Sequence, residues 1–161
     1  MLLANDGVRQ RPSASRLAAL AQAAAARHDW AALVRYSQAE RWYQRLEQGD
    51  NHEVWLLSWL PGQRTGFHDH CGSAGAFAVV HGELREYTPG GRGAGAPSGA
   101  DFAAGQVRPF GPAHVHEVVN SSGEPAVSIH AYSPPLAGMR RYELTSGGLV
   151  LAAVETAGER W

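Results

Sequence analysis

The segment Gly62–His70, GQRTGFHDH, decides the fold expected for this chain, because it carries two histidines separated by one residue. Alternate residues of a β-strand face the same side, so His68 and His70 project together while Asp69 points away. Imidazole suits iron, zinc, copper and nickel. Histidine pairs also occur on ordinary strands, at the surface or in the core, so this pair alone does not establish a metal site.

A second segment, Gly111–Asn120 (GPAHVHEVVN), supplies two candidates for a third ligand. His114 and His116 are again two residues apart. Strand alternation therefore places both on one face and does not choose between them.

Together the two segments resemble the two-part signature of the cupin family, G-x5-H-x-H followed by P…H-x3-N. In this resemblance the second motif falls on His116 and Asn120, which favours His116 over His114 as the third ligand. The resemblance covers about residues 54–132. The metal ligands that it implies are His68, His70 and His116.

The sequence around these motifs is typical of a fold with many short strands. Its 19 glycines and 9 prolines separate short apolar or alternating runs. About nine strands are expected, at residues 54–60, 65–70, 76–80, 83–87, 103–107, 114–120, 126–132, 141–145 and 149–154. Such strands with close turns favour a closed barrel or jelly roll, which removes sheet edges. Residues 88–100, rich in Gly and Pro, are expected to form a surface loop.

The N-terminal part is expected to be helical. Residues 13–26 are rich in alanine and begin with serines that can serve as an N-cap, and Asp29 can cap a second short helix. We therefore expect a mostly β fold, a cupin-type β-barrel (jelly roll) with short N-terminal α-helices. The 161 residues fit one domain, in which a helical segment (1–45) packs on a barrel (54–154).

Charge and composition argue against several classes of partner. A net charge of -1 and a pI near 6.7 give no basic excess for nucleic acid or for a membrane surface. No stretch approaches the ~20 apolar residues of a membrane-spanning helix, and no signal-peptide core is evident. Cys71 is the single cysteine, so no internal disulfide forms and a cytoplasmic location is expected. No obligate protein partner is evident.

The metal motif departs from the common cupin pattern in one respect. Most cupins place a glutamate four or five residues after the second histidine, but Ala74 and Gly75 occupy those positions here. The expected site is therefore three neutral histidines without a carboxylate, which leaves a bound ion its full 2+ charge. Such a site suits an anionic bidentate substrate together with O2.

The segment Ala126–Pro135, AVSIHAYSPP, places Ser128, His130 and Tyr132 on one face of an expected strand. If this polar face points inward, each group needs a hydrogen-bond partner. A chain from the serine through the histidine to the phenol satisfies that need. An outward-facing polar strand is the alternative.

This run and the histidine site together resemble the thiol dioxygenase family, the cysteine dioxygenases in particular. The family's Ser-x-His-x-Tyr triad falls on Ser128, His130 and Tyr132 and is followed by the matching Ser-Pro-Pro. The resemblance implies catalytic roles for these three residues. In animal members a cysteine forms a thioether with the triad tyrosine, but that cysteine is replaced by Gly75 here. We therefore expect Tyr132 to be unmodified.

The resemblance also implies substrate-binding residues. The family's Tyr-x-Arg, whose arginine pairs with the substrate carboxylate, falls on Tyr43 and Arg45. A planar guanidinium is well suited to clamp a carboxylate, although without the resemblance Arg45 reads as a solvated arginine. The family's tryptophan, nine residues before the first metal histidine, falls on Trp59.

The activity implied is that of an Fe(II) enzyme that uses O2 to oxidise L-cysteine to cysteine sulfinic acid. Members selective for 3-mercaptopropionate carry glutamine at the position of Arg45, so Arg45 favours cysteine. Three alternatives stay open: a dioxygenase of 3-mercaptopropionate or another small thiol, a non-catalytic metal-binding cupin, and a zinc enzyme.

Overall fold

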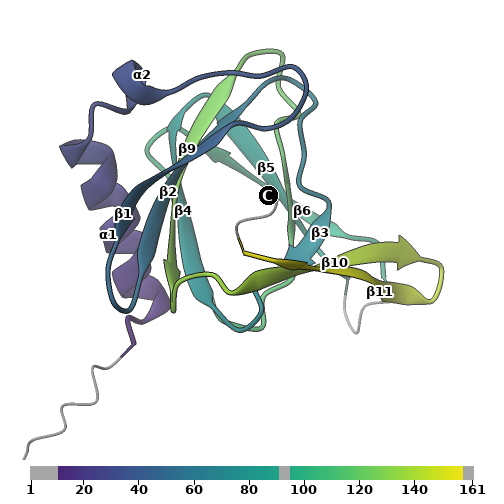
Figure 1. Ribbon diagram of the computed structural model, residues 1–161. Coiled ribbons are helices and arrows are strands. Elements are labelled where there is room, and N and C mark those ends of the chain that lie inside the picture. Colours follow the sequence, from purple (N-terminus) through teal and green to yellow (C-terminus); the bar gives the residue numbers. More distant parts are fainter. Residues whose placement is uncertain (1–10, 91–94, 158–161) are drawn as a thin grey trace, which may run out of the picture.

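The computed structural model describes residues 11–90 and 95–157, which form two helices and eleven strands (Figure 1). The helices are α1 (Ala14–Arg27) and α2 (Trp30–Leu33). The strands up to the gap are β1 (Tyr43–Gln48), β2 (Glu53–Trp59), β3 (Phe67–Asp69), β4 (Ala74–His81) and β5 (Glu83–Thr88). The strands after it are β6 (Ser98–Ala103), β7 (Val107–Phe110), β8 (Glu117–Val119), β9 (Ala126–Ser133), β10 (Gly138–Thr145) and β11 (Gly148–Thr156).

The strands form three sheets rather than one hydrogen-bonded ring. The largest sheet has the order β1-β2-β9-β4-β7, and two three-stranded sheets have the orders β11-β10-β3 and β6-β5-β8. Figure 1 shows the smaller sheets facing the five-stranded one, so that the three surround a common interior. The mostly β fold with N-terminal helices is therefore confirmed, whereas the sheets of the described residues do not close into a barrel.

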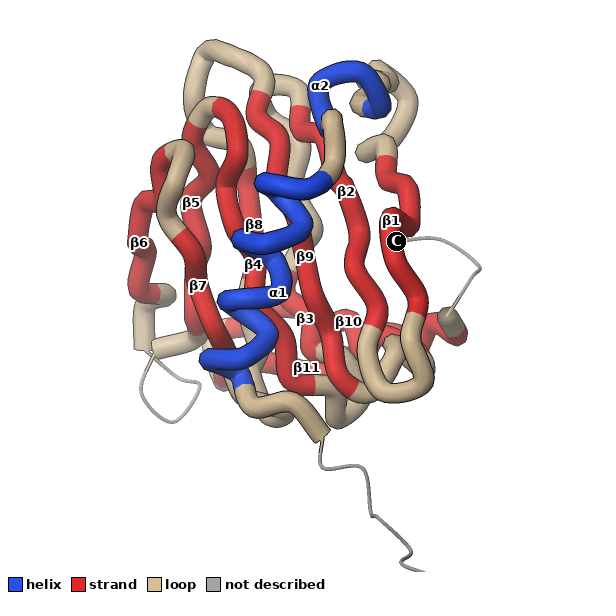
Figure 2. The backbone as a smooth tube through the Cα atoms, turned by 90° about the vertical axis from the view of Figure 1, so that its left-hand side faces the viewer, coloured by secondary structure: helices blue, strands red, loops and turns tan. Residues whose placement is uncertain are grey.

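Helix α1 lies across the outer face of the five-stranded sheet (Figure 2). The Ser13 hydroxyl caps it by accepting a hydrogen bond from the Arg16 backbone N–H at 3.3 Å. One face of the helix is fully buried in a cluster with the outward side chains of β9. The members of this contact are Leu17, Ala21, Ala24, Val127, Ile129 and Ala131. Neither described helix is long and apolar enough to cross a membrane.

Strand β9 has two faces of opposite chemistry. All of its residues are buried, because it lies in the middle of the large sheet with β2 on one side and β4 on the other. Its apolar face meets α1, so Ser128, His130 and Tyr132 face the interior. The alternative of an outward-facing polar strand is therefore wrong.

Three expected boundaries are wrong. Residues 43–45, placed in the helical N-terminal segment, belong to β1, which pairs with β2 over the hairpin at Gly49. Residues 98–100, placed in a surface loop, belong to β6, which pairs with β5. The strand expected at 103–107 instead spans a turn, in which Gly105 has a φ of +92°. The strands β1 and β6 each form by pairing with a strand that neighbours them in the sequence. Residues 91–94 of the expected loop lie outside the described part of the chain.

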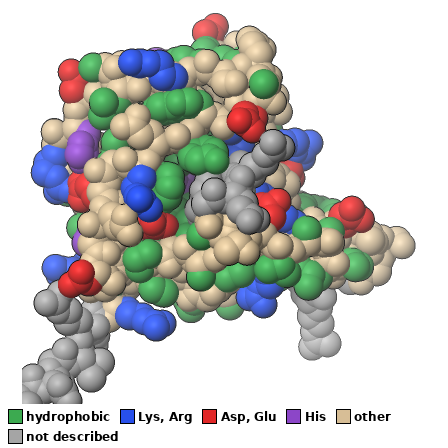
Figure 3. All heavy atoms as spheres, viewed as in Figure 1, with side chains coloured by type: hydrophobic (Ala, Val, Ile, Leu, Met, Phe, Trp, Pro, Cys, Tyr) green, Lys and Arg blue, Asp and Glu red, His purple; other side chains and the backbone are tan. Residues whose placement is uncertain are grey.

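The β10–β11 hairpin is less buried than the large sheet. Val150, Leu151 and Val154 of β11 are 53%, 52% and 65% exposed. Figure 3 shows apolar side chains along this hairpin where it projects from the body of the molecule. Its partner strand β3 nevertheless connects it to the metal motif, because Arg141 of β10 lies opposite His68.

Candidate functional site

Three histidines that the sequence singled out meet in the interior. His68 lies on β3, His70 directly follows that strand, and His116 directly precedes β8. His68 and His116 form an isolated antiparallel bridge, with backbone N–H to carbonyl distances of 2.9 and 3.0 Å in the two directions. One ring nitrogen from each histidine lies within 4.8 Å of the others. All three side chains are at most 3% exposed.

Hydrogen bonds fix the ring nitrogens that remain free. The Nδ1 atom of His68 lies 3.0 Å from the Gly66 carbonyl, which can only accept, so Nδ1 carries the proton and Nε2 has a lone pair. The Nδ1 atom of His116 likewise lies 2.8 Å from Oε1 of Glu86. His70 has no hydrogen-bond partner for either ring nitrogen among the described residues.

These features fit a metal ion. Burial, together with the neighbouring histidines, lowers the pKa of His68 and His70 well below the usual value. Burial also lowers the pKa of His116, although its hydrogen bond to Glu86 opposes this. Neutral imidazoles with converging lone pairs are metal ligands, and a buried unpaired His70 is costly unless something binds it. The three residues therefore form a possible metal site.

His114, the competing ligand candidate, instead contacts a carboxylate. Its Nε2 lies 2.8 Å from Oε1 of Glu86, the same oxygen that His116 contacts. Arg108 donates from Nε to the other oxygen of Glu86 at 2.7 Å. Burial raises the pKa of Glu86, but the bonds from His114, His116 and Arg108 outweigh this and hold it well below the usual range. Glu86 is therefore an ionised carboxylate behind the metal site.

A second network runs along the inner face of β9. Trp59 donates from Nε1 to the Ser128 hydroxyl at 2.9 Å, and this hydroxyl lies 2.8 Å from Nε2 of His130. Nδ1 of His130 lies 3.1 Å from the Tyr132 hydroxyl. In the arrangement that uses every donor, the serine donates to Nε2 and the histidine donates from Nδ1 to the phenol oxygen. The phenol proton is then free to point into the cavity.

This β9 relay (Trp59, Ser128, His130 and Tyr132) is uncharged. Burial lowers the pKa of His130 to about 3, with His116 and Arg41 contributing in the same direction. Burial raises the pKa of Tyr132 well above its usual value. The relay therefore holds a neutral histidine and a protonated phenol at neutral pH.

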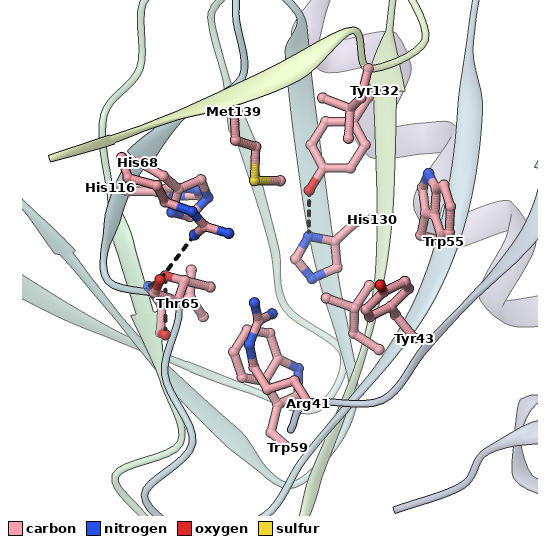
Figure 4. Close-up of a pocket in the computed structure, with 14 residues that line it drawn as sticks. Arg41, Tyr43, Trp55, Trp59, Thr65, His68, His116, His130, Tyr132 and Met139 are labelled. Carbon is pink, nitrogen blue, oxygen red and sulfur yellow. Dashed lines mark hydrogen bonds between the residues drawn. The ribbon is translucent and has the colours of Figure 1, made fainter. Parts of the chain in front are cut away.

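The two networks border one cavity, which Figure 4 shows in close-up. Its polar wall includes His68, His116, His130 and Tyr132. Apolar side chains fill much of the remaining wall, and they are Trp55, Leu57, Val118, Leu136 and Met139. In Figure 4 the Tyr132 phenol and the Arg41 guanidinium point into the same space from different sides. The cavity thus combines the possible metal site with a hydroxyl donor and a cation.

The structure places Arg41, not Arg45, in this cavity. The Arg41 guanidinium lies over the Trp59 ring, 4.9 Å from its centroid. Among the described residues it has no carboxylate partner. Burial, followed by the charge of Arg141, lowers its pKa to about 10, so it stays charged at neutral pH.

Arg45 lies outside the cavity lining. Its side chain is 45% exposed, lies over Trp55, and has Nη1 at 3.8 Å from Glu53. Tyr43, its partner in the expected pair, does line the cavity, and so does Trp59. Eight of the nine expected site residues therefore lie together, either in the cavity lining or in direct contact with a residue that lines it. Arg45 is the one that lies apart.

Gly75 lies opposite Tyr132 in the β4–β9 pairing. A Cβ atom built on Gly75 would come within 2.5 Å of Cζ of Phe110 and 2.9 Å of Cδ1 of Tyr132. The Phe110 ring therefore fills the space that a side chain at this position would need.

Three site residues escaped the sequence analysis: Arg41, Glu86 and Arg141. The alternation of Arg41 with Tyr43 was a usable signal, since it suggests a shared face just before β1. Glu86 alternates with the fully buried Leu84 on β5, which marks an inward carboxylate. For Arg141 no sequence signal was available, because its place beside His68 depends on the register of β10 with β3.

Comparison with known proteins places the chain in a family. The family model of cysteine dioxygenase type I matches residues 9–145. The protein TT1209 from Thermus thermophilus is 24% identical, with a TM-score of 0.59 and coverage of 67% of this chain and 96% of its own. A conserved protein with a double-stranded β-helix domain from Klebsiella pneumoniae is 21% identical, with a TM-score of 0.58 and coverages of 78% and 96%.

An RmlC-like cupin from Desulfovibrio desulfuricans is 16% identical, with a TM-score of 0.58 and coverages of 68% and 96%. At these identities the solved structures support the cupin fold alone. A comparison with curated proteins gave no match. The family model, however, spans most of the 161 residues. The chain therefore belongs to the cysteine dioxygenase type I family.

Proposed function

We propose that this protein is an iron(II)-dependent thiol dioxygenase that oxidises a small thiol carboxylate, with L-cysteine as the reference substrate, to the sulfinic acid. The observation that carries the proposal is that two members of the histidine site, His68 and His116, and the phenol of the β9 relay line one cavity. Family membership supports the same activity.

The reaction is R–SH + O2 → R–SO2H. Two S–O bonds form while the O–O bond breaks, and the sulfur atom gives up four electrons to O2. An iron(II) ion held by His68, His70 and His116 would supply binding of the thiolate and electron transfer to O2. The carbon–sulfur bond stays intact, and no further reductant is needed.

The residues of the chain bind and orient the substrate. We assign the substrate carboxylate to Arg41, because its guanidinium is charged, faces the cavity and has no carboxylate partner in the described chain. Trp59 stacks below Arg41 and at the same time donates to Ser128, so it couples the carboxylate site to the β9 relay. Tyr43 completes this side of the cavity.

Tyr132 holds its proton and can donate a hydrogen bond toward the sulfur or the incoming oxygen atoms. His130 fixes the phenol from behind, and Ser128 fixes His130. The apolar wall, which includes Leu57, Val118 and Leu136, limits the access of water to the thiolate. We also infer that the reaction takes place in the cytoplasm, where thiols are kept reduced.

The test is to load the purified protein with iron(II), supply L-cysteine, and follow O2 uptake and product by mass spectrometry. We expect one O2 consumed for each sulfinate formed, with both oxygen atoms derived from ¹⁸O2. Cystine as the sole product would refute the dioxygenase and favour a metal-binding cupin without this activity. Equal turnover with zinc would refute the requirement for iron.

The carboxylate assignment has a separate test. Arg41→Met should raise the KM for L-cysteine at least tenfold, since loss of ~1.4 kcal/mol corresponds to a factor of ten. Arg45→Met should change the KM less than threefold. The opposite ranking would return the substrate clamp to Arg45.

A further inference from the structure

The segment that carries Arg41 connects α2 to β1 and contains no helix or strand (residues 35–42). In Figure 1 this connection leaves α2, crosses one end of the sheets and turns back into β1. Its exposed residues line a surface groove, and they are Gln38, Ala39 and Glu40. Three residues line both this groove and the cavity, namely Arg41, Thr65 and Arg141. The segment is therefore the wall that separates this part of the cavity from solvent.

Both ends of this segment are fixed by one residue of β2. The Ser58 hydroxyl donates to the Arg35 carbonyl at 2.6 Å, and the Ser58 backbone N–H donates to the Trp42 carbonyl at 3.0 Å. Ser58 is itself buried in the large sheet. These two contacts fix where the segment begins and ends, but they leave residues 36–41 between them without support.

The middle of the segment is fixed by Gln63. Nε2 of Gln63 donates to the Ser37 carbonyl at 2.9 Å, and Oε1 accepts from the Leu60 backbone N–H at 2.9 Å. The two contacts also fix which way the amide points, because its oxygen only accepts and its nitrogen only donates. Among the described residues, no other hydrogen bond joins residues 37–41 to the rest of the protein. The Gln63 amide is therefore the support of this wall.

Gln63 is itself held firmly. Its backbone N–H donates to the Leu60 carbonyl at 3.0 Å, and its carbonyl accepts from the Asn120 backbone N–H at 3.0 Å. The fully buried Asn120 side chain donates to the Trp59 carbonyl at 3.0 Å. Trp59 also supplies the ring on which the Arg41 guanidinium lies. The bond from Gln63 to Ser37 therefore fixes the backbone that carries Arg41 relative to that ring.

We infer that Gln63 is a positioning residue for Arg41: it holds residues 37–41 against the cavity and so keeps the guanidinium over Trp59. When this bond is broken, the segment opens more often and Arg41 leaves the cavity, while the histidine site and the β9 relay are unchanged. The inference rests on the proposed function only for its kinetic consequence, because substrate binding is assigned there to Arg41.

The first test measures opening of the segment and needs no turnover. Gln63→Glu keeps the oxygen that accepts from Leu60 but places a second acceptor against the Ser37 carbonyl. Trypsin cleavage of the folded protein after Arg41 should become ~5-fold faster or more, the order expected for loss of one hydrogen bond. Cleavage after Arg45, on the paired strand β1, is the internal reference and should change less than twofold. Mass spectrometry of the early fragments measures both rates.

Gln44→Glu is the matched control, because it makes the same change of charge at an exposed position of β1 and should leave both rates unchanged. Gln63→Met removes the donor without adding a charge. It should also accelerate cleavage after Arg41, and it carries the test if Gln63→Glu does not fold. An unchanged rate after Arg41, or equal acceleration after Arg41 and Arg45, would overturn the inference.

The second test asks whether Gln63 acts through Arg41. In the iron-loaded protein, Gln63→Glu should raise the KM for L-cysteine ~5-fold and change kcat less than twofold. In the Arg41→Met background the same substitution should change KM less than twofold, because the group that Gln63 positions is gone. An unchanged KM in the otherwise native protein, or a rise by the same factor in both backgrounds, would refute the inference. If no thiol is oxidised, the proposed function fails, and the cleavage rates still decide the role of Gln63.

Discussion

Two buried polar networks border the histidine site, and they differ in charge. The Glu86 network joins an ionised carboxylate to Arg108, His114 and His116. The nitrogens of these three residues lie 2.7 to 2.8 Å from the carboxylate oxygens. The β9 relay contains neutral groups and ends at the Tyr132 hydroxyl in the cavity. The charged network holds a ligand still, whereas the neutral one presents a proton. Mutations in the two networks should therefore have different effects.

The largest expected effect comes from removing a proposed metal ligand at the point where the charged network meets the site. His116→Ala should abolish stoichiometric metal binding, because only two converging imidazoles remain. Metal analysis of the purified protein after dialysis measures this. His114→Ala is the matched control and should retain one metal ion per chain. If His114→Ala loses the metal and His116→Ala keeps it, the ligand assignment is wrong.

A mutation at Glu86, one step further from the metal, should have a smaller effect on metal binding. Glu86→Gln removes the charge behind His116 and should weaken metal binding by ~10–100-fold, the usual cost of losing such a partner. Titration of the metal-free protein with zinc in the presence of a competing chelator measures the affinity. Glu83→Gln, an exposed position on the same strand, should leave it unchanged. An unchanged affinity in Glu86→Gln would show that the carboxylate only neutralises Arg108.

A mutation in the β9 relay should lower turnover and leave metal binding intact. Tyr132→Phe removes the hydroxyl but keeps the ring, so metal binding should stay intact while kcat falls by ~100-fold or more, as expected for loss of a positioned proton donor. Tyr142→Phe is the control, because this phenol contacts Asp69 and lies outside the cavity. Native turnover in Tyr132→Phe would make the relay structural.

The smallest expected effect is on stability. His130 takes up a proton near pH 6.5 when unfolded but only near pH 3 when folded. Between these values the unfolded chain binds more protons, so the free energy of unfolding falls as the pH falls. The slope is at most ~1.4 kcal/mol per pH unit for this group. Denaturant unfolding of the metal-free protein between pH 7.5 and 5 measures it.

His130→Gln should reduce that slope by about one proton, and it should lower the stability at pH 7.5 because the relay loses a member. The exposed His81 offers a control, His81→Gln, which should leave the stability at pH 7.5 nearly unchanged. The same slope in His130→Gln and the native protein would mean that His130 takes up its proton equally in both states.

The sequence predicted the parts of this site that depend on short spacing. The Ser-x-His-x-Tyr run lies on one strand, and the His-x-His pair begins on β3 and continues in the residue after it, so alternation predicts which way these side chains point. Arg41 and Arg45 could not be ranked in that way, because both alternate with Tyr43. Arg141 reaches the cavity through the pairing of β10 with β3, a contact between strands far apart in the chain.

The fold shows the same limit. The apolar runs and turns predicted most strands, but β1 and β6 form on polar sequence because each has a partner strand. Strand propensity is a property of the paired surface more than of the segment itself. Closure of the sheets likewise depends on contacts between strands that a local pattern does not encode.

The contact between Gly75 and Phe110 constrains the order in which mutations can accumulate. A cysteine at residue 75 would meet the Phe110 ring at 2.5 Å, so it is tolerated only after Phe110 has become smaller or moved. Shrinking Phe110 first, however, removes a ring that stacks on His70 at 5.0 Å. A thioether between residue 75 and Tyr132 therefore needs two coupled substitutions, one at Gly75 and one at Phe110.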